Sequence, residues 1–297
     1  MYKTFRVLCL TILLLPGLSY GKTRSKKIVK PIANAKILTY NVLADSSEKR
    51  RRLGKLFKIL RTSKADIIAL QEVSPWFVKR LKRQRWFKKY YTPRYRRGRR
   101  KRRRIIYDGG LLILSKKPIK IYSMGPLPGY TNRTYLIVRT KIRNVNFTIA
   151  TCHLESPLDA FDARARQLDF FFDKLAVFEN AILLGDFNFG DHELPETNHL
   201  PNEFVDVWRI TNGFNRGYTW NIEKNPMAKS GSFVGETSRR LDRILIKSKR
   251  VKPIKTKIIG NKPVKKHSKI FPSDHFGILS WILIEKIDTN KNSKSKR

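Results

Sequence analysis

Short apolar segments recur along the chain, and each is bounded by polar residues, glycine or proline. Runs of this length, rich in valine, isoleucine, leucine and phenylalanine, are typical of buried β-strands. The predicted strands lie at residues 37–41, 67–70, 111–114, 135–138, 147–152, 181–184, 241–246 and 276–284. Arg143, Asn144 and Val145 separate two of these segments and predict a hairpin turn.

Other segments carry apolar residues at a spacing of three or four, which is the period of an α-helix with one buried face. The predicted helices span residues 49–60, 75–89 and 161–178. Many strands with a few interposed helices favour a mixed α/β sandwich in which helices cover packed sheets. Because no repeat and no long linker divides the sequence, we expect one domain over residues 33–285 and a basic flexible tail over 286–297.

The first residues have the three-part layout of a secretory signal peptide. Lys3 and Arg6 precede an apolar run at 7–15, and the small residues that follow predict a signal peptide over residues 1–21. The apolar run is too short for a membrane span, which needs about 20 residues. We therefore expect an exported protein without a transmembrane segment. Its only cysteine after cleavage is Cys152, which we interpret as a buried strand residue rather than a reactive thiol.

The net charge changes this picture more than any other global property. The 297 residues include 64 Lys and Arg against 23 Asp and Glu, which gives a formal net charge of +41. Such an excess destabilises a folded chain by self-repulsion unless a polyanion relieves it, so it predicts a polyanionic partner. Hydrophobic residues at 41% and aromatic residues at 11% exclude a disordered basic tail, because such tails lack the apolar surface needed for folding.

One segment concentrates the positive charge, because nine of the eleven residues from 94 to 104 are lysine or arginine. We expect a long loop that contacts phosphates near or beside the functional site. A solvated charge run and a localisation signal are the alternatives. The predicted nucleic-acid contacts are Arg94, Arg96, Arg97, Arg99, Arg100, Lys101, Arg102, Arg103 and Arg104.

Polar residues with metal-binding or proton-transferring side chains follow or interrupt the apolar segments. They are Asn41, Glu72, His153, Asp186, Asn188, Asp242, Asp274 and His275. All lie at strand ends except Asp242, which is expected inside its strand. If the strands run together, their ends converge and place these side chains in one pocket. A single residue of this kind is usually an exposed turn residue, but the repetition in six segments favours a functional site.

The oxygen-rich composition of this pocket favours a hard divalent cation, Mg²⁺ before Mn²⁺ or Ca²⁺. Magnesium in proteins is commonly held by one or two carboxylates and by phosphate oxygens, so the pocket favours phosphoester chemistry. A zinc site is disfavoured because His192 and His199 lie seven residues apart and fit no standard zinc spacing. The sequence contains no Walker loop, dinucleotide fingerprint or Gly-x-Ser-x-Gly elbow.

The polar residues belong to six short motifs. These are Thr39-Tyr40-Asn41, Gln71-Glu72, His153-Leu154-Glu155-Ser156, Gly185-Asp186-Phe187-Asn188, Leu241-Asp242-Arg243-Ile244 and Ser273-Asp274-His275. In this order they resemble the endonuclease/exonuclease/phosphatase superfamily, whose fold is deoxyribonuclease I-like. The resemblance implies a four-layered α/β sandwich of two packed mixed β-sheets flanked by helices, and a Mg²⁺-dependent phosphoric diester hydrolase as the catalytic domain. It implies that Glu72 binds the metal, with Asn41 and Asp274 close to it.

The same resemblance implies catalytic roles for the remaining motif residues. Asp186 would orient or deprotonate the attacking water, and Asn188 would hold a phosphate oxygen. His275, oriented by Asp242, would stabilise the charge that develops around phosphorus. His153 would donate a hydrogen bond to a phosphate oxygen or to the leaving group.

A narrower resemblance is to the tyrosyl-DNA phosphodiesterase subfamily. It rests on His153-Leu154-Glu155-Ser156 with Arg164 and Arg166-Gln167-Leu168, on Val205-Asp206-Val207-Trp208, on Tyr218-Thr219-Trp220 and on Arg240-Leu241-Asp242-Arg243-Ile244. It implies a DNA-processing site with Trp220 as a nucleic-acid contact. The departures are Tyr40, where tryptophan is usual, and Gly190, where a basic residue is expected.

Three functions remain open on the sequence alone. The first is an exported metal-dependent phosphodiesterase that acts as a monomer on nucleic acid, with DNA favoured, as a nuclease or a 5′-tyrosyl-DNA phosphodiesterase. The second keeps the fold but hydrolyses a phospholipid or inositol phosphate at anionic membranes. The third is a non-catalytic basic binding module, which is disfavoured because no motif position is lost.

Overall fold

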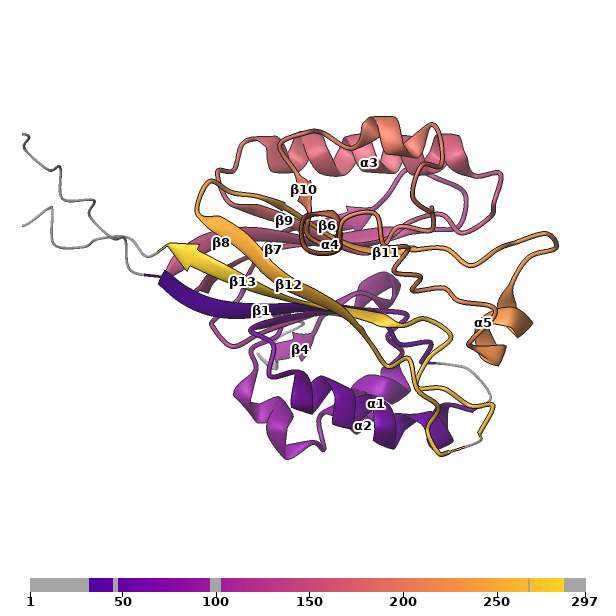
Figure 1. Cartoon of the computed structure of the whole chain (residues 1–297). Helices are drawn as coiled ribbons and strands as arrows, with labels where there is room; N and C mark the ends of the chain where they lie inside the picture. Colours follow the sequence, from indigo (N-terminus) through magenta and orange to yellow (C-terminus); the bar gives the residue numbers. More distant parts are fainter. Residues whose placement is uncertain (1–31, 45–47, 97–102, 267, 286–297) are drawn as a thin grey trace, which may run out of the picture. The chain divides into compact units, whose positions relative to one another are not determined.

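The computed structural model describes residues 32–44, 48–96, 103–266 and 268–285 (Figure 1). These residues all belong to the compact unit Pro31–Arg297. Several sequence predictions lie outside the described residues, namely the signal peptide at 1–21, the tail at 286–297, and Arg97, Arg99, Arg100, Lys101 and Arg102 of the basic segment.

Two mixed β-sheets form the centre of this unit. The first has the order β12-β13-β1-β2-β5 and consists of β1 (Ile32–Asn41), β2 (Ile67–Gln71), β5 (Leu112–Ser115), β12 (Val251–Ile259) and β13 (Gly277–Glu285). The second has the order β10-β11-β9-β8-β7-β6 and consists of β6 (Lys120–Pro126), β7 (Thr134–Ile142), β8 (Val145–His153), β9 (Ala181–Asp186), β10 (Val205–Asp206) and β11 (Asp242–Lys247). The short strands β3 (Arg94–Arg96) and β4 (Arg103–Ile105) form a separate antiparallel ribbon.

Helices cover the outer face of each sheet (Figure 1). The first sheet carries α1 (Lys49–Ser63), α2 (Pro75–Leu81) and the 3₁₀ turn η1 (Arg85–Lys89), and the second carries α3 (Phe161–Ala176). Shorter elements are η2 (Asp108–Gly110), η3 (Glu196–His199), α4 (Val207–Asn212) and α5 (Pro226–Gly231). This arrangement confirms the predicted sandwich of two mixed sheets flanked by helices. In the described part of the chain, no helix is both long and apolar enough to cross a bilayer.

Three apolar clusters fill the spaces between the layers. The largest lies between the sheets and includes Ile37, Val138, Ile149 and Ile244. The other two lie between each sheet and its helices, and Cys152 is fully buried in the cluster under α3. Burial raises the pKa of the Cys152 thiol, which supports its interpretation as a packing residue rather than a nucleophile.

The eight predicted strands are all present, with ends that shift by up to five residues. The prediction of one helix over 75–89 is wrong, because α2 ends at Leu81 and the chain continues as η1. The break lets Trp86 and Phe87 turn toward the helix layer, where the Trp86 ring lies 6.5 Å from the ring of Phe57. The hairpin at Arg143 and Asn144 is confirmed, and both residues have positive φ as a two-residue β-hairpin turn requires.

Six chain segments meet at one edge of the sandwich, which we call the polar rim. The parallel pairs β1–β2 and β8–β9 both end there. β13 runs antiparallel to β1 and β11 runs antiparallel to β9, so these two strands begin there instead. Asp242 is therefore the first residue of β11, opposite Asp186, and the expectation that it lies inside a strand is corrected.

A buried network of charged residues holds the chain just beyond β9. Asp191 accepts hydrogen bonds from Arg240 Nε at 3.0 Å and from Arg243 Nη1 at 2.9 Å. Asp206 accepts one from Arg240 Nη2 at 2.7 Å, and Arg243 also donates to the carbonyl oxygen of Phe189. Burial alone would raise the pKa of Asp191, but these guanidinium groups lower it well below its usual range.

This network predicts a large loss of stability when one carboxylate is removed. Asp191→Asn removes one of the two carboxylates that neutralise the buried guanidinium groups of Arg240 and Arg243, and we expect it to lower the free energy of unfolding by about 3 kcal/mol in urea titrations at pH 7. Because the pKa of Asp191 is lowered on folding, its contribution is present above the unfolded-state pKa of about 4 and is lost as the pH falls below it.

The exposed Asp173 on α3 provides the control, and Asp173→Asn should change the stability by less than about 0.5 kcal/mol. Equal effects of the two substitutions would show that the network does not stabilise the fold.

Candidate active site

The backbone at the polar rim is shaped to turn side chains inward. Glu72 and Asn188 follow β2 and β9, and both adopt positive φ values, 55° and 54°, which cost non-glycine residues energy. Gly110 packs against the turn at Glu72, where an added Cβ would lie 3.1 Å from the Glu72 Cα. A larger residue at Gly110 would therefore displace the backbone that presents the Glu72 carboxylate.

Asn41 connects the two sheets at the rim. Its side-chain nitrogen donates to Glu72 Oε1 at 2.8 Å and to Asp186 Oδ2 at 2.9 Å. Asn41 is fully buried, and its own carbonyl oxygen accepts a hydrogen bond from Ser273 Oγ at 2.8 Å. The side-chain amide of Asn41 thus joins β1 to β9 and to the residue that follows β2, and its backbone carbonyl group joins the segment before β13.

Asp242 orients the imidazole of His275 and keeps it charged. Asp242 Oδ2 lies 2.8 Å from His275 Nδ1, and the opposite ring nitrogen lies 3.5 Å from Asp186 Oδ2. Burial lowers the pKa of His275, but the carboxylates of Asp186 and Asp242 outweigh it and raise that pKa well above its usual value. Burial alone would raise the pKa of Asp186, but the two neighbouring histidines and the hydrogen bond from Asn41 lower it. The pair therefore presents an imidazolium beside a buried carboxylate.

His153 has the opposite protonation state. Burial, together with the nearby guanidinium of Arg133, lowers its pKa to about 3 despite the Asp186 carboxylate 3.5 Å from its Nε2. Arg133 Nη1 lies 3.1 Å from His153 Nδ1, and since arginine can only donate, Nδ1 must be the acceptor. The ring proton is therefore on Nε2, which faces Asp186 and, at 4.0 Å, Glu72 Oε1. His153 is a neutral donor aimed into the site.

The rim side chains surround a pocket of about 290 Å³. Glu72, His153, Asp186, Asn188, Asp274 and His275 all line it, together with Trp220. Asn188 contributes a side-chain amide that donates to the Leu154 carbonyl oxygen at 2.8 Å, and its backbone N–H donates to Asp186 Oδ1. The sequence thus identified residues that the fold brings together in one small cavity.

Two groups of residues at the rim have the donor types that bind a cation. Asp186, Asp242 and His275 each bring one ligand atom within 4.8 Å of the others, but they are buried and engaged in the hydrogen bonds described above. Glu72 instead keeps 34% of its side chain exposed to the pocket. Desolvation and the neighbouring Asp274 carboxylate raise the pKa of Glu72 to about 7. A carboxyl group whose ionisation is opposed by burial and by a neighbouring carboxylate suits a site completed by a cation.

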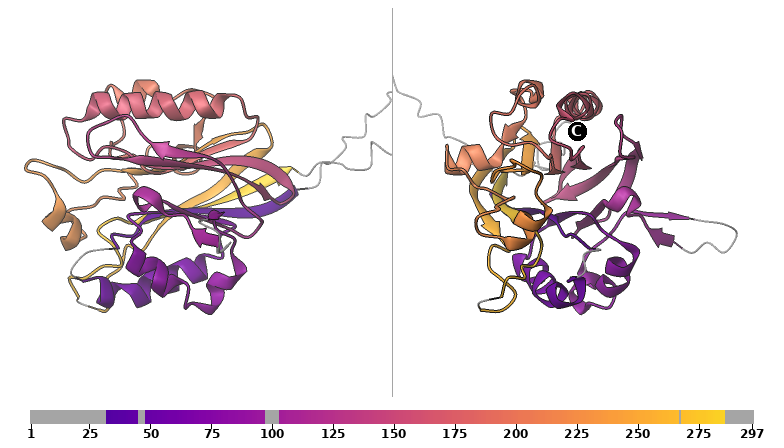
Figure 2. Two further views of the ribbon diagram at one scale, coloured as in Figure 1. Left: turned by 180° about the vertical axis from the view of Figure 1, so that it is seen from behind. Right: turned by 90° about the vertical axis from the view of Figure 1, so that its right-hand side faces the viewer.

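The described ends of the basic segment, β3 and β4, do not line the pocket at the rim. Tyr91, which precedes β3, pairs with Ser115 at the end of β5 far from the rim, and the chain returns after β4 to Gly110 next to Glu72. The β3–β4 ribbon therefore stands along the outer edge of the first sheet and projects sideways in Figure 2. Arg94 is exposed there.

Trp220 is placed differently from the arginines of the basic segment. It is only 7% exposed, and its ring centroid lies 5.0 Å from that of His275. It forms a wall of the pocket and packs against the imidazole of His275. Only the part of its ring that lines the cavity is open to a ligand.

Sequence reasoning missed Arg133 as a site residue. Arg133 lies in the loop before β7, where no periodic pattern distinguishes it from many other arginines. The loop is held by Glu155, which accepts hydrogen bonds from the N–H groups of Tyr130 and Thr131 at 2.8 Å and 3.0 Å. Glu155 belongs to the motif that begins at His153. The motif therefore contains the residue that positions this loop, but nothing in the motif indicates the role of Arg133.

Comparisons with known proteins agree with this geometry. The chain belongs to the Endonuclease/Exonuclease/phosphatase family, whose model matches residues 38–275. It is 27% identical over 263 residues to tyrosyl-DNA phosphodiesterase 2 of Xenopus laevis, an alignment that covers 82% of this chain and 64% of the frog protein. The human protein of the same name is 27% identical over 261 residues, with 82% of this chain and 66% of that protein covered. The chain thus spans about two thirds of the length of these relatives.

Solved structures show the same fold. The crystal structure of D. rerio TDP2 complexed with a single-strand DNA product superimposes with a TM-score of 0.68 and 25% identity, covering 84% of this chain and 99% of the other. Truncated TDP2 of Caenorhabditis elegans gives a TM-score of 0.65 at 20% identity, over 84% of this chain and 97% of the other. The fold and the family of hydrolases are therefore established, together with a distant homology to tyrosyl-DNA phosphodiesterase 2.

The hydrogen bond from Arg133 predicts a positioning role. In Arg133→Met the donor is lost while most of the side-chain volume remains, so His153 is free to rotate or to change tautomer. We expect kcat on a generic phosphodiester such as bis-p-nitrophenyl phosphate to fall roughly 10- to 100-fold, as for partners that orient functional histidines in metal sites, with little change in thermal stability.

Arg216→Met is the matched control, because Arg216 is an exposed loop arginine that does not line the pocket. A kcat for Arg133→Met equal to that of this control would exclude the positioning role.

Proposed function

We propose that the protein is a Mg²⁺-dependent phosphodiesterase that hydrolyses phosphodiester bonds of nucleic acid, with DNA as the favoured substrate. The observation that carries the proposal is the convergence, in one pocket, of an acidic pair suited to a cation with a neutral histidine donor, a charged histidine and a buried carboxylate. This combination matches what the hydrolysis of a phosphate diester requires.

We assign the metal position to Glu72, with Asn41 and Asp274 beside it. Glu72 has a partly exposed carboxylate, and its raised pKa reflects burial together with the negative charge of Asp274, which a cation would offset. The oxygen donors and the lack of cysteine in the pocket fit Mg²⁺ better than zinc, with Mn²⁺ as a substitute. When bound, such an ion supplies positive charge against the phosphate oxygens.

The remaining side chains have complementary roles in our proposal. Asp186, with its lowered pKa, stays ionised and orients or deprotonates the attacking water. His275 carries a proton fixed by Asp242 and stabilises negative charge on the phosphoryl oxygens. His153 donates from Nε2 to a phosphate oxygen or to the leaving group, and Asn188 holds a further phosphate oxygen through its amide.

Several observations support nucleic acid as the substrate. The formal net charge of +41 favours a polyanion, and the arginine-rich ribbon stands along the outer edge of the first sheet, where we propose that it contacts phosphates. The D. rerio relative was crystallised with a single-strand DNA product. Hydrolysis of a 5′-tyrosyl phosphodiester, which the name of the relatives describes, is the narrower form of this proposal. Export through the segment 1–21 stays a prediction from the sequence.

A substrate panel tests the proposal. We expect Mg²⁺-dependent product from plasmid, single-stranded oligonucleotide or 5′-tyrosyl oligonucleotide, and none from sphingomyelin or inositol-phosphate substrates. Asp186→Asn and His275→Gln should each lower kcat by at least about 10²-fold, because each removes a charge-stabilising or proton-transferring group.

His199→Gln is the matched histidine control, since His199 is bound only to the exposed Asp169 outside the pocket. Hydrolysis of lipid alone would replace the nucleic-acid proposal by the membrane alternative. Wild-type rates for both site variants would overturn the assignment of the active site.

The metal assignment predicts a linked change in stability. Mg²⁺ at about 100 times its Kd should raise the unfolding midpoint of the wild-type protein by roughly 5–10 °C, because a ligand that binds only the folded state stabilises it by about 2.7 kcal/mol. Glu72→Gln should abolish this shift, whereas Glu203→Gln, an exposed carboxylate paired with Lys247, should retain it. A full shift in Glu72→Gln, measured by differential scanning calorimetry, would place the ion elsewhere.

A further inference from the structure

The outer face of the second sheet is only partly covered by α3. On β7 and β8, the residues that face this helix are apolar, and they include Ile137 and Ala150. The helix ends at Ala176. Because side chains on one face of a strand recur at every second position, the next residues on the same face are Arg139 and Lys141 on β7 and, opposite them, Thr148 and Asn146 on β8. The face therefore changes from apolar to cationic and polar where the helix stops.

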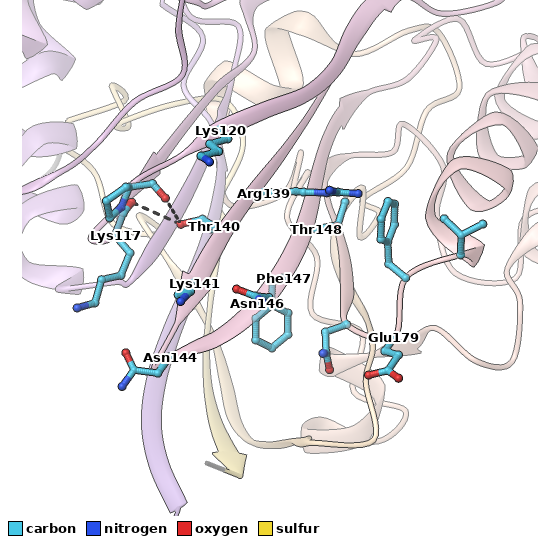
Figure 3. Close-up of a pocket in the computed structure, with 14 residues that line it drawn as sticks. Lys117, Lys120, Arg139, Thr140, Lys141, Asn144, Asn146, Phe147, Thr148 and Glu179 are labelled. Carbon is cyan, nitrogen blue, oxygen red and sulfur yellow. Dashed lines mark hydrogen bonds between the residues drawn. The ribbon is translucent and has the colours of Figure 1, made fainter. Parts of the chain in front are cut away.

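This uncovered end of the sheet forms a pocket of about 790 Å³, which we call the distal basic pocket (Figure 3). The turn before β6 adds Lys117 and the first residue of β6 adds Lys120, and the segment that precedes β9 forms the opposite wall with Glu179 and Asn180. The cations that line the pocket are Lys117, Lys120, Arg139 and Lys141.

The positive charges in this pocket are not neutralised by the surrounding protein. Lys120 and Arg139 stand directly opposite each other on β6 and β7, and like charges in this position destabilise a sheet. Among the residues that the structure describes, none of the four cations forms an ion pair with a carboxylate. Glu179 is the one acidic residue that lines the pocket. An anionic ligand would relieve this repulsion.

The pocket is also held in a fixed shape. Arg139 stacks over the ring of Tyr122 at 4.4 Å and over that of Phe178 at 5.0 Å, so its guanidinium is oriented before any ligand arrives. Thr140 Oγ1 donates to the Pro118 carbonyl oxygen at 2.9 Å, which ties the turn that carries Lys117 to β7. Preformed cationic groups lose little entropy on binding a phosphate.

The distal basic pocket lies at the end of the sandwich opposite the polar rim. β8 lines the pocket from Asn146 to Thr148 and ends at the rim with His153, and five to seven steps of about 3.3 Å give a separation of roughly 17–23 Å along the strand. A short substrate held at the rim therefore does not reach the pocket. Arg139 and Lys141 are two residues apart on one strand, or about 7 Å, which is close to the distance between neighbouring phosphates along one strand of a duplex.

We propose that the distal basic pocket binds the phosphodiester backbone of nucleic acid, separately from the active site. The choice of nucleic acid as the polyanion rests on the proposed function. The binding site itself is inferred from the unpaired cations and from the fixed orientation of Arg139. The protein then contacts nucleic acid at both ends of the sandwich, in addition to the contact proposed for the β3–β4 ribbon, so that it retains a long substrate, or a second molecule, while the rim acts on a phosphodiester.

The test compares two triple variants of equal charge. The pocket variant carries Lys117→Gln, Lys120→Gln and Lys141→Gln, and it spares the stacked Arg139. The control variant carries Lys252→Gln, Lys255→Gln and Lys257→Gln, three exposed lysines on β12 of the other sheet. Both variants lose the same net charge, so a difference between them reports local contact and not the overall field. Binding to a 40-base-pair duplex is measured in EDTA at several salt concentrations, and cleavage of a four-nucleotide substrate is measured with Mg²⁺.

We expect the pocket variant to bind the duplex at least 10-fold more weakly than the control variant at about 0.1 M salt. Its slope of log affinity against log salt should be smaller by about 2, since each lost phosphate contact in a duplex removes about 0.9. Its kcat on the four-nucleotide substrate should equal that of the wild type.

Other outcomes overturn the proposal in distinguishable ways. Equal duplex affinities and salt slopes for the two triple variants would eliminate the distal contact even if the wild-type enzyme cleaves DNA. A defect of the pocket variant that is confined to binding of phosphatidylserine vesicles would replace nucleic acid by an anionic membrane as the ligand. If the wild type cleaves no nucleic acid but binds the duplex through the pocket, the proposed function fails and the binding site stands.

Discussion

The buried carboxylate of Asp186 is the charge around which the site is built. A lone carboxylate in this position would be expensive to desolvate, and it is tolerated because Asn41, His153, His275 and the backbone N–H of residue 188 all surround it with donors. Two of these partners come from the first sheet or its entry segment, whereas Asp186 ends a strand of the second. The polar contacts at the rim and the apolar contacts between the two sheets must therefore form together. This requirement fixes the position of one sheet relative to the other.

The two histidines of the rim differ in protonation state because their neighbours differ. Both are buried and both lie 3.5 Å from the same Asp186 oxygen. Asp242 on the far side of His275 keeps that ring protonated, and Arg133 on the far side of His153 keeps the other ring neutral. Each ring thus has a second neighbour besides Asp186, which is Asp242 for His275 and Arg133 for His153. This neighbour determines whether the ring supplies a positive charge or a neutral hydrogen bond.

Most of the fold and the principal site residues are predictable from the sequence for one physical reason. Strands buried on both faces appear as continuous apolar runs, and a polar residue at the end of such a run is conspicuous. β12 escaped prediction because one of its faces is exposed and carries Lys252, Lys255 and Lys257, which break the run. The helix predicted over 75–89 was too long because aromatic residues after Leu81 pack on α1 and leave the helical path. Arg133 has no local pattern, since its position follows from the loop that Glu155 holds.

The order in which the rim is assembled has a consequence for the newly made chain. Asn41 contacts a residue 145 positions away, and its carbonyl oxygen is bound by Ser273, 232 positions away. Contacts of such sequence separation form slowly, since the intervening chain must be ordered first. The site therefore does not exist on a nascent chain until residues 273–275 have been synthesised. Under the proposed function, the unfinished chain would thus be inert toward the nucleic acids of the ribosome that produces it, because folding itself is the safeguard.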